Sequence, residues 1–310
     1  MRILSMLVTA AVIGFAAGAA AQTDNAELKP ENDPNSCSDL WKGIGLPDYA
    51  REIDDTVIVC HSRYVLSHNN ANKQPDWVIE HLTREQISGT NKRPKMKFQP
   101  DPSIPDESAR ALDKDYANSK FDRGHQAPSD DFKANRDWMV ESFFLSNIVP
   151  QVGVGFNRGI WKQLEDHVRD VVRSRGELYV VTGPVFPGPD GNGKLTISKT
   201  ENTCKNKIDL DPPKRAAICG AATKCENGVR VPSALFKIVY DPGTKRANAF
   251  ILPNINHRDS KDFDDPIEYL RGYQVSVRVV ERFTGIEFFR DIPLRQRRPI
   301  AEQCAGLFGH

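Results

Sequence analysis

Residues 122–128, Asp-Arg-Gly-His-Gln-Ala-Pro, place a cation, a glycine and a titratable base side by side. Cleavage of a phosphodiester bond needs a group that holds the phosphate, a base that deprotonates water and positive charge that stabilises the transition state. Arg123 can do the first and third of these, and His125 the second. Asp122 is expected to anchor Arg123 or the loop. The alternative is a surface turn with a salt-bridged Asp and Arg, because so short a motif recurs by chance.

Further polar residues follow in a fixed order: Ser-Asn-Ile-Val-Pro-Gln at 146–151, Asn-Arg-Gly-Ile-Trp at 157–161 and Leu-Glu-Asp at 164–166. Together with the first motif they resemble the DNA/RNA non-specific endonucleases of the Serratia nuclease and endonuclease G type, over about residues 57–289. The resemblance implies that Asn157 is the direct protein ligand of a Mg²⁺ ion, that Glu165 orients the metal-bound waters, and that Asn147 supports the site. The apolar, glycine-rich residues 152–156 depart from the family pattern.

The mechanism implied is metal-dependent hydrolysis. We expect His125 to remove a proton from water and the hydroxide to attack phosphorus in line. Mg²⁺, or Mn²⁺ or another divalent cation, is expected to stabilise the pentacovalent state and the leaving 3′ oxygen. Arg93 and Arg123 would neutralise the non-bridging oxygens, since a planar guanidinium can bind two oxygens at once. Arg158 is a further candidate for substrate binding. The family implies 5′-phosphate products from DNA and RNA alike.

The spacing of Asn157 and Glu165 limits how they can share an ion. Eight residues of α-helix rise about 12 Å, so the two side chains are not expected to bind one small cation directly. Mg²⁺ keeps several waters, so Glu165 can act through one of them. The alternative for Glu165 is a solvent-facing ion pair with Lys162 or Arg169.

Two other functions stay open. The chain could be a secreted nucleic-acid-binding protein of the same fold without turnover, although His125, Asn157 and Glu165 are all present. It could also be a phosphodiesterase for small substrates, which would not nick supercoiled plasmid. DNA and RNA are the expected substrates, and a protein inhibitor and a homodimer are open alternatives as further partners.

The charge of the chain excludes one class of protein. The 310 residues include 42 basic and 41 acidic side chains. A protein that coats DNA gains its affinity by neutralising many phosphates and is strongly basic. Near-neutrality is compatible with an enzyme that has a locally basic groove.

Residues 1–21 predict a signal peptide, because Arg2 precedes an apolar run and Ala19, Ala20 and Ala21 supply a small-residue cleavage site. Serine, threonine and glycine residues interrupt the run, which argues against an uncleaved membrane anchor. We therefore expect a secreted or periplasmic protein with no membrane association after cleavage.

Six cysteines are consistent with disulfides in an oxidising compartment: Cys37, Cys60, Cys204, Cys219, Cys225 and Cys304. The sequence contains no Cys-x-x-Cys pair, the spacing that would indicate a zinc site. Cys37 with Cys60 is the preferred pair, and the pairing of the other four is left open.

These motifs need a scaffold of strands and helices. Strands are expected at 56–66 and 76–82, as a hairpin turning at 69–72, and at 177–182, 234–240 and 247–252. Apolar residues at helical spacing predict a helix over 160–175 ending before Gly176, and shorter helices are expected at 135–144 and 266–271. The expected fold class is α+β, a mainly antiparallel central sheet flanked by helices with a ββα-metal (His-Me finger) site. His125 would lie on the strand side and Asn157 on the helix. Residues 22–310 are expected to form one domain, with an extension at 22–50 and a core at about 51–295.

Overall fold

The computed structural model describes residues 32–50, 55–186, 194–198, 204, 207–222, 225, 227–259 and 265–302. The predicted signal peptide at 1–21 and Cys304 lie outside these residues.

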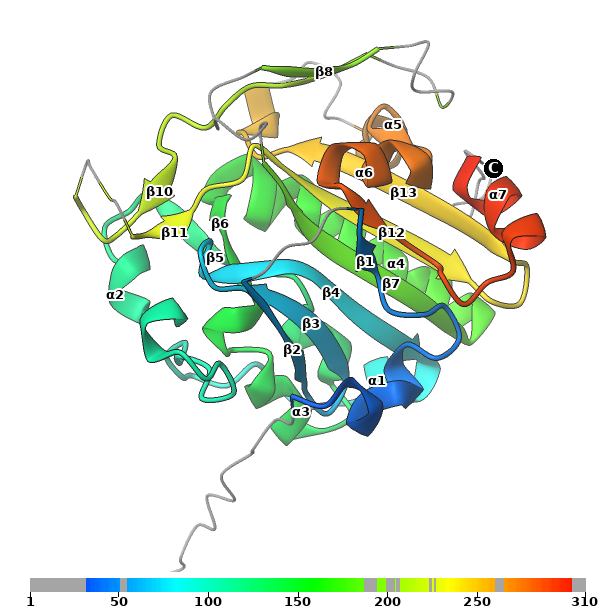
Figure 1. Cartoon of the computed structure of the whole chain (residues 1–310), viewed down its shortest axis with the longest axis horizontal. Helices are drawn as coiled ribbons and strands as arrows, with labels where there is room; N and C mark the ends of the chain where they lie inside the picture. Colours follow the sequence, from blue (N-terminus) through cyan, green and yellow to red (C-terminus); the bar gives the residue numbers. More distant parts are fainter. Residues whose placement is uncertain are drawn as a thin grey trace, which may run out of the picture.

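A seven-stranded antiparallel sheet, in the order β14-β13-β12-β7-β4-β3-β2, lies at the centre of the fold (Figure 1). Its strands are β2 (Thr56–Cys60), β3 (Tyr64–Asn69), β4 (Gln74–Thr83), β7 (Glu177–Val185), β12 (Ala234–Asp241), β13 (Arg246–Pro253) and β14 (Gln274–Val275). The expected strands at 177–182, 234–240 and 247–252 correspond to β7, β12 and β13.

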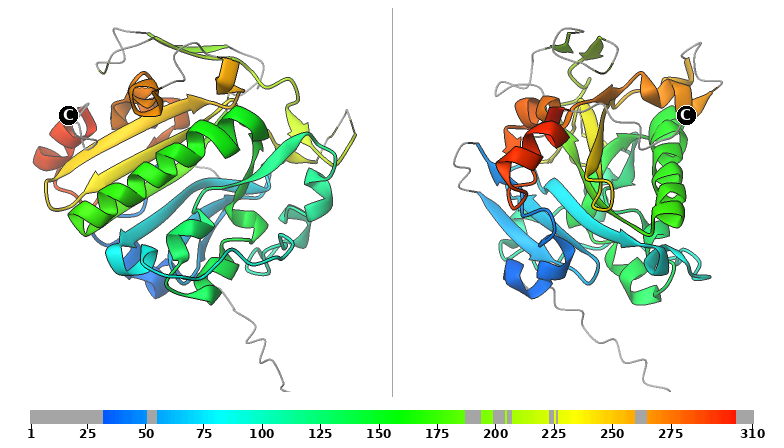
Figure 2. Two further views of the ribbon diagram at one scale, coloured as in Figure 1. Left: turned by 180° about the vertical axis from the view of Figure 1, so that it is seen from behind. Right: turned by 90° about the vertical axis from the view of Figure 1, so that its right-hand side faces the viewer.

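Helices cover both faces of this sheet. The long helix α4 (Trp161–Arg175) lies on one face, and α6 (Val277–Thr284) and α7 (Leu294–Glu302) lie on the other (Figure 2). Alternate residues of a strand point to opposite faces. Accordingly, Leu235 and Val239 of β12 belong to the core beneath α4, whereas Phe236 and Ile238 belong to the core shared with α6.

Residues 84–176 leave the sheet at the end of β4 and return at the start of β7. These two ends are neighbours, because Thr83 pairs with Glu177 and the backbone N–H of Arg84 donates to the carbonyl oxygen of Gly176 at 2.8 Å. The segment contains α1 (Arg84–Ile87), η2 (Glu107–Ala109), α2 (Asp113–Tyr116), β5 (Phe121–His125), η3 (Ser129–Phe132), α3 (Arg136–Glu141), η4 (Leu145–Asn147), β6 (Ile148–Val152), η5 (Gly153–Ile160) and α4.

The remaining elements are short. They are η1 (Pro34–Leu40), β1 (Asp48–Tyr49), β8 (Leu195–Ile197), β9 (Ile208–Leu210), β10 (Ala217–Ile218), β11 (Val229–Arg230), η6 (His257–Asp259), α5 (Pro266–Arg271) and β15 (Ile286–Glu287). The α+β class expected from the sequence is confirmed, and the helices expected at 135–144 and 266–271 correspond to α3 and α5. Among the described residues, no helix combines the length and the apolar character needed to cross a membrane.

The strand expected at 56–66 is two strands, β2 and β3, with a reversal at His61, Ser62 and Arg63. The backbone N–H of His61 donates to the carbonyl oxygen of Tyr64 at 2.8 Å. The reversal is held by a distant residue, since the N–H and hydroxyl of Ser62 donate to the two carboxylate oxygens of Glu141 at 2.8 and 2.7 Å. No glycine, proline or asparagine marks this turn, so the local sequence did not predict it. The expected hairpin is β3–β4.

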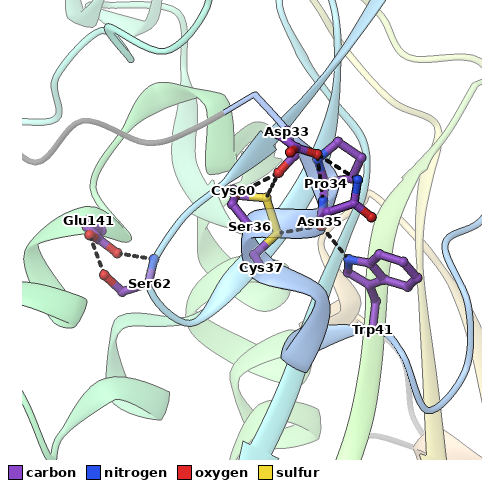
Figure 3. The surroundings of a disulfide bond; sticks show 9 residues. All are labelled: Asp33, Pro34, Asn35, Ser36, Cys37, Trp41, Cys60, Ser62 and Glu141. Atoms are coloured by element: carbon purple, nitrogen blue, oxygen red, sulfur yellow. Dashed lines mark hydrogen bonds between the residues drawn. A yellow bond between two sulfur atoms is a disulfide. The ribbon is translucent and has the colours of Figure 1, made fainter.

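The predicted disulfide between Cys37 and Cys60 is confirmed, and it ties η1 to the end of β2 (Figure 3). Nearby, the indole N–H of Trp41 donates to the carbonyl oxygen of Pro34 at 3.0 Å. A second disulfide joins Cys219 to Cys225, and Cys204 is also disulfide-bonded. None of the described cysteines is free.

Candidate active site

One cavity of about 170 Å³ brings together six of the residues expected from the sequence to act in the site. It is lined by Arg93, Arg123, His125, Asn157, Arg158 and Glu165, together with Pro128, Ser129, Asp130 and Lys162. All of these residues belong to segment 84–176, between β4 and β7.

His125 is placed by the β5–β6 hairpin, in which it ends β5 and pairs with Ile148. The hairpin requires glycine at the preceding position, because a Cβ atom at Gly124 would overlap with the side chain of Gln151. The close approach of the two strands therefore explains the glycine of the first motif.

Asn147 holds the chain that follows His125. Its side-chain nitrogen donates to the carbonyl oxygens of Ala127 and Ser142 at 2.9 and 3.0 Å, and its oxygen accepts from the N–H of Ala127 at 2.9 Å. Asn147 is fully buried and does not line the cavity. Its connection to the site is therefore through the backbone next to His125.

The surroundings of His125 keep its imidazole neutral. The side chain is 8% exposed, and its ring centre lies 5.4 Å from that of Phe98 and 5.2 Å from that of Phe143. Burial, with a smaller contribution from the positive charge of Arg93, lowers the pKa of His125 to about 3. Its Nε2 atom is buried and has no hydrogen-bond partner among the described residues. A neutral imidazole can accept a proton, as a general base must.

Asp122 organises the other side of the cavity. Its carboxylate accepts a hydrogen bond from Asn157 Nδ2 at 3.0 Å and forms an ion pair with Arg158, with 2.8 Å between Nε and Oδ2. Arg123, the partner of Asp122 expected from the sequence, instead pairs with Asp113 at 2.7 Å. Because Asp122 occupies the nitrogen of the Asn157 amide, the amide oxygen is the atom left for a ligand in the cavity.

Asn157 lies in η5, a π-helical segment, and the regular helix begins only at Trp161. The backbone of η5 departs from helical geometry at Gly155, with φ of 85°, and at Gly159, with φ of −125° and ψ of −114°. The regular-helix distance between Asn157 and Glu165 expected from the sequence does not apply across this kink. Both residues reach the same cavity.

The three arginines differ in how their charge is used. Arg123 is paired with Asp113, to whose carbonyl oxygen it also donates at 2.8 Å, and Arg158 is paired with Asp122. Arg93 is exposed and forms no ion pair with a described residue, and its guanidinium lies 5.0 Å from the ring centre of Phe143. Arg93 is therefore the cation most available to a phosphate.

Glu165 is half-buried at the edge of the cavity, and burial raises its pKa to about 7, an effect opposed by the positive charges of Lys237 and Arg169. The solvent-facing ion pair considered from the sequence is not formed among the described residues. Lys162 pairs with Asp166 at 2.5 Å, and Arg169 pairs with Asp131 and Asp166 at 2.5 Å each.

The donors on the cavity suit a hard divalent cation with few protein ligands. They include the amide oxygen of Asn157 and the carboxylate of Glu165, both oxygen ligands of the type that Mg²⁺ prefers. Within the described ranges, no group of three or more His, Cys, Asp or Glu residues could enclose a metal ion. An ion here would therefore keep most of its waters, as Mg²⁺ usually does.

Sequence reasoning missed the charged residues beneath the cavity. Glu80, Asp131 and Lys237 are buried, and Lys237 lies in an otherwise apolar strand, Ala-Leu-Phe-Lys-Ile-Val-Tyr. A single lysine in an apolar strand was the available signal, since charged side chains are rarely fully buried.

Three comparisons relate the chain to known proteins. The family model for DNA/RNA non-specific endonuclease matches residues 48–294. A nuclease of Syncephalastrum racemosum is 36% identical over 250 residues, which cover 79% of this chain and 70% of that protein. Human mitochondrial nuclease EXOG is 30% identical over 303 residues, which cover 93% of this chain and 73% of that protein. A solved structure of an EndoG/EndoGI complex has a TM-score of 0.64 and 31% identity, and covers 84% of this chain and 93% of that chain.

These comparisons contradict the secreted or periplasmic location that was expected from the sequence. Similar proteins from zebrafish, human, yeast and nematode are named as mitochondrial, which points to mitochondria instead. The prediction depended on an apolar N-terminal segment and an even number of cysteines. An apolar leader and disulfides do not by themselves identify a compartment.

Proposed function

Because the chain belongs to the DNA/RNA non-specific endonuclease family, we propose that it cleaves both DNA and RNA with one Mg²⁺ ion and leaves 5′-phosphate ends. The coarser conclusion is direct: the chain is an endonuclease of a divalent-metal-dependent family, with nucleic acid as its substrate. The finer proposal is supported chiefly by one observation, the meeting of a neutral histidine, two oxygen donors and three arginines at one cavity.

His125 acts as the general base. Its lowered pKa keeps the imidazole unprotonated at neutral pH, so it can accept a proton from a water molecule in the cavity. The resulting hydroxide attacks phosphorus on the side opposite the leaving 3′ oxygen. Phe98 and Phe143 fix the ring by packing against it.

Asn157 and Glu165 would hold the metal ion. Asn157 would bind it directly through Oδ1, in the orientation fixed by Asp122, and Glu165 would bind through water. When bound, the ion supplies positive charge that stabilises the pentacovalent phosphorus and the leaving oxygen. Asn147 supports the site indirectly by fixing Ala127, two residues after His125.

The arginines bind the phosphate. Arg93 is unpaired among the described residues and is the first contact, and Arg123 and Arg158 extend the positive wall of the cavity. Contacts to phosphate carry no sequence information by themselves. A site built from such contacts would cleave with little sequence preference and would accept either sugar.

The proposal is tested by incubating the purified chain with supercoiled plasmid and with RNA, each with Mg²⁺ and with a chelator. Nicking and RNA cleavage that require the metal are expected, and T4 ligase should reseal the plasmid nicks because it needs 5′-phosphate and 3′-hydroxyl ends. Binding of plasmid without cleavage would favour the catalytically silent protein. Hydrolysis of a small phosphodiester without nicking would favour the small-substrate phosphodiesterase.

We also propose that residues 22–310 form one nuclease domain. A protein inhibitor that blocks the cavity is proposed because the similar solved structure is a complex described as a mechanism of EndoG inhibition. The homodimer stays a prediction, which light scattering on the purified protein would decide.

A further inference from the structure

Three polar side chains lie in a row across the sheet, on the face that α4 covers. They are Glu80 on β4, Thr182 on β7 and Lys237 on β12, each 1% exposed. Thr182 pairs in register with Lys237, and Glu80 lies on the next strand opposite Val180. Leu235 and Val239, two residues before and after Lys237, contribute to the apolar core beneath α4. The row therefore occupies positions where an apolar core would be expected.

The ammonium group of Lys237 lies directly beneath α4. It donates to the hydroxyl of Thr182 at 2.6 Å and lies 5.2 Å from the ring centre of Trp161. Residues four apart on a helix lie on the same side. Trp161, Glu165 and Arg169 are spaced in this way, so α4 presents all three toward the row.

Lys237 differs from Arg169, which is also a buried cation. Arg169 is in contact with two carboxylates, Asp131 and Asp166. Lys237 has no carboxylate at ion-pair distance among the described residues, and its one hydrogen bond is to a neutral hydroxyl. Its charge therefore acts on neighbouring carboxylates without forming an ion pair with any of the described ones.

Three carboxylates from different elements act on the charge of Lys237. Burial lowers the pKa of Lys237, and the negative charge of Glu165 opposes this most, followed by those of Glu80 on β4 and Asp131 on η3. Reciprocally, Lys237 is the cation that most opposes the effect of burial on the pKa of Glu165. Glu165 is also the only one of the three that lines the cavity.

A buried ammonium group without a carboxylate in contact is costly, and an apolar side chain of similar length often packs there at no loss of stability. A lysine in this position is therefore better explained by its effect on the site than by the stability of the fold.

We propose that Lys237 is a positioning residue for the hydrolytic site: its ammonium group, fixed by Thr182 beneath α4, attracts the Glu165 carboxylate and keeps it in place at the cavity. Glu165 can then bind the waters of the metal ion. This inference rests on the proposed function, in which Glu165 acts on the metal through water.

The test compares Lys237→Met, which keeps the length and removes the charge, with Lys237→Arg, which keeps the charge. Leu235→Met, on the same strand and the same face, controls for a changed core side chain. Mn²⁺ binding is measured by electron paramagnetic resonance without nucleic acid, and thermal unfolding is measured with a chelator present. Lys237→Met should bind Mn²⁺ about 10- to 100-fold more weakly, with a melting temperature at or above that of the wild type. Lys237→Arg should recover part of the affinity, and Leu235→Met should match the wild type.

Unchanged Mn²⁺ affinity in folded Lys237→Met would overturn the inference. If Lys237→Met does not fold, Thr182→Val provides the test, because it removes only the hydroxyl that fixes the ammonium group of Lys237. A Mn²⁺ affinity equal to that of the wild type in Thr182→Val would then overturn the inference. Plasmid nicking by the wild type separates this result from the proposed function. If the wild type binds Mn²⁺ but cleaves neither DNA nor RNA, the proposed function is wrong. The Mn²⁺ affinities of the Lys237 variants still decide whether Lys237 acts on the metal site.

Discussion

Asp122 accepts a hydrogen bond of 3.0 Å from the side-chain nitrogen of Asn157, and this bond decides which end of the amide faces the cavity. The same carboxylate is held from the solvent side by Arg158. The aspartate of the first sequence motif is thus connected to Asn157, 35 residues later in the chain. It does not pair with the arginine beside it.

Replacing Asp122 with alanine should weaken metal binding. Without its partner the Asn157 amide can rotate, and loss of a group that orients a metal ligand typically costs ~10 to 100-fold in affinity or activity. Arg158→Ala is the matched variant, since it removes the other partner of Asp122. It should raise the KM for nucleic acid and leave Mn²⁺ affinity near the wild-type value. Equal Mn²⁺ affinity in the wild type and Asp122→Ala would contradict the orienting role.

Replacing His125 with alanine should remove most cleavage and leave the fold intact, because general-base catalysis contributes ~100 to 10,000-fold. Plasmid nicking measures the loss, and circular dichroism checks the fold. Added imidazole is expected to restore part of the rate. A well-folded variant that nicks at a near-normal rate would disprove the role of His125.

The two proposed metal-binding residues should respond differently. Asn157→Ala removes the direct ligand and should lose most activity and need much more Mg²⁺. Glu165→Gln keeps the size and hydrogen bonding but removes the charge, so its Mg²⁺ requirement should rise by less. A role for Glu165 that does not involve the metal predicts an unchanged Mg²⁺ requirement in Glu165→Gln. Mg²⁺ titrations of plasmid nicking distinguish these outcomes.

The lowered pKa of His125 predicts a dependence of stability on pH. The group titrates near 6.5 when unfolded and at about 3 when folded. The unfolded chain therefore binds an extra proton between these values, and the wild type loses stability relative to His125→Ala as the pH falls below about 6.5. Urea unfolding of both proteins at pH 7.5 and pH 5 measures this difference. Nuclear magnetic resonance at pH 5 should find the His125 ring neutral, and a charged ring would show that burial does not control it.

Removing the Cys37–Cys60 disulfide should destabilise the protein more than removing Cys219–Cys225. The bridges span sequence separations of 23 and 6 residues. In the chain-entropy account they contribute roughly 3 and roughly 2 kcal/mol, because the longer loop restricts the unfolded chain more. Denaturant unfolding of the two double alanine variants gives the comparison. The reverse order would indicate that local packing, not loop length, sets their contributions.

The local patterns in the sequence predicted the helix at 160–175 and the strands that became β7, β12 and β13, because each has a clear period and a turn residue at its end. The family resemblance supplied the residues that meet at the cavity. The turn at Ser62 was missed because Glu141, which holds it, is 79 residues away. Glu80, Asp131 and Lys237 were missed for the same reason: their proximity depends on the pairing of strands distant in sequence. Long-range contacts of this kind produce no regular spacing of apolar residues in the local sequence.

The segment 84–176 starts and ends at two paired residues, Thr83 and Glu177, and supplies every side chain that lines the cavity. The sheet therefore contributes no residue to the wall of the cavity, and in the proposed role Lys237 acts on the site from beneath α4. The two ends of this segment join the sheet at one place, and α4 and the hydrogen bonds between Ser62 and Glu141 also hold the segment against the sheet. The loops of the segment can lengthen, shorten or acquire new substrate contacts without any change in strand order, so divergence among proteins of this fold is expected to concentrate between β4 and β7.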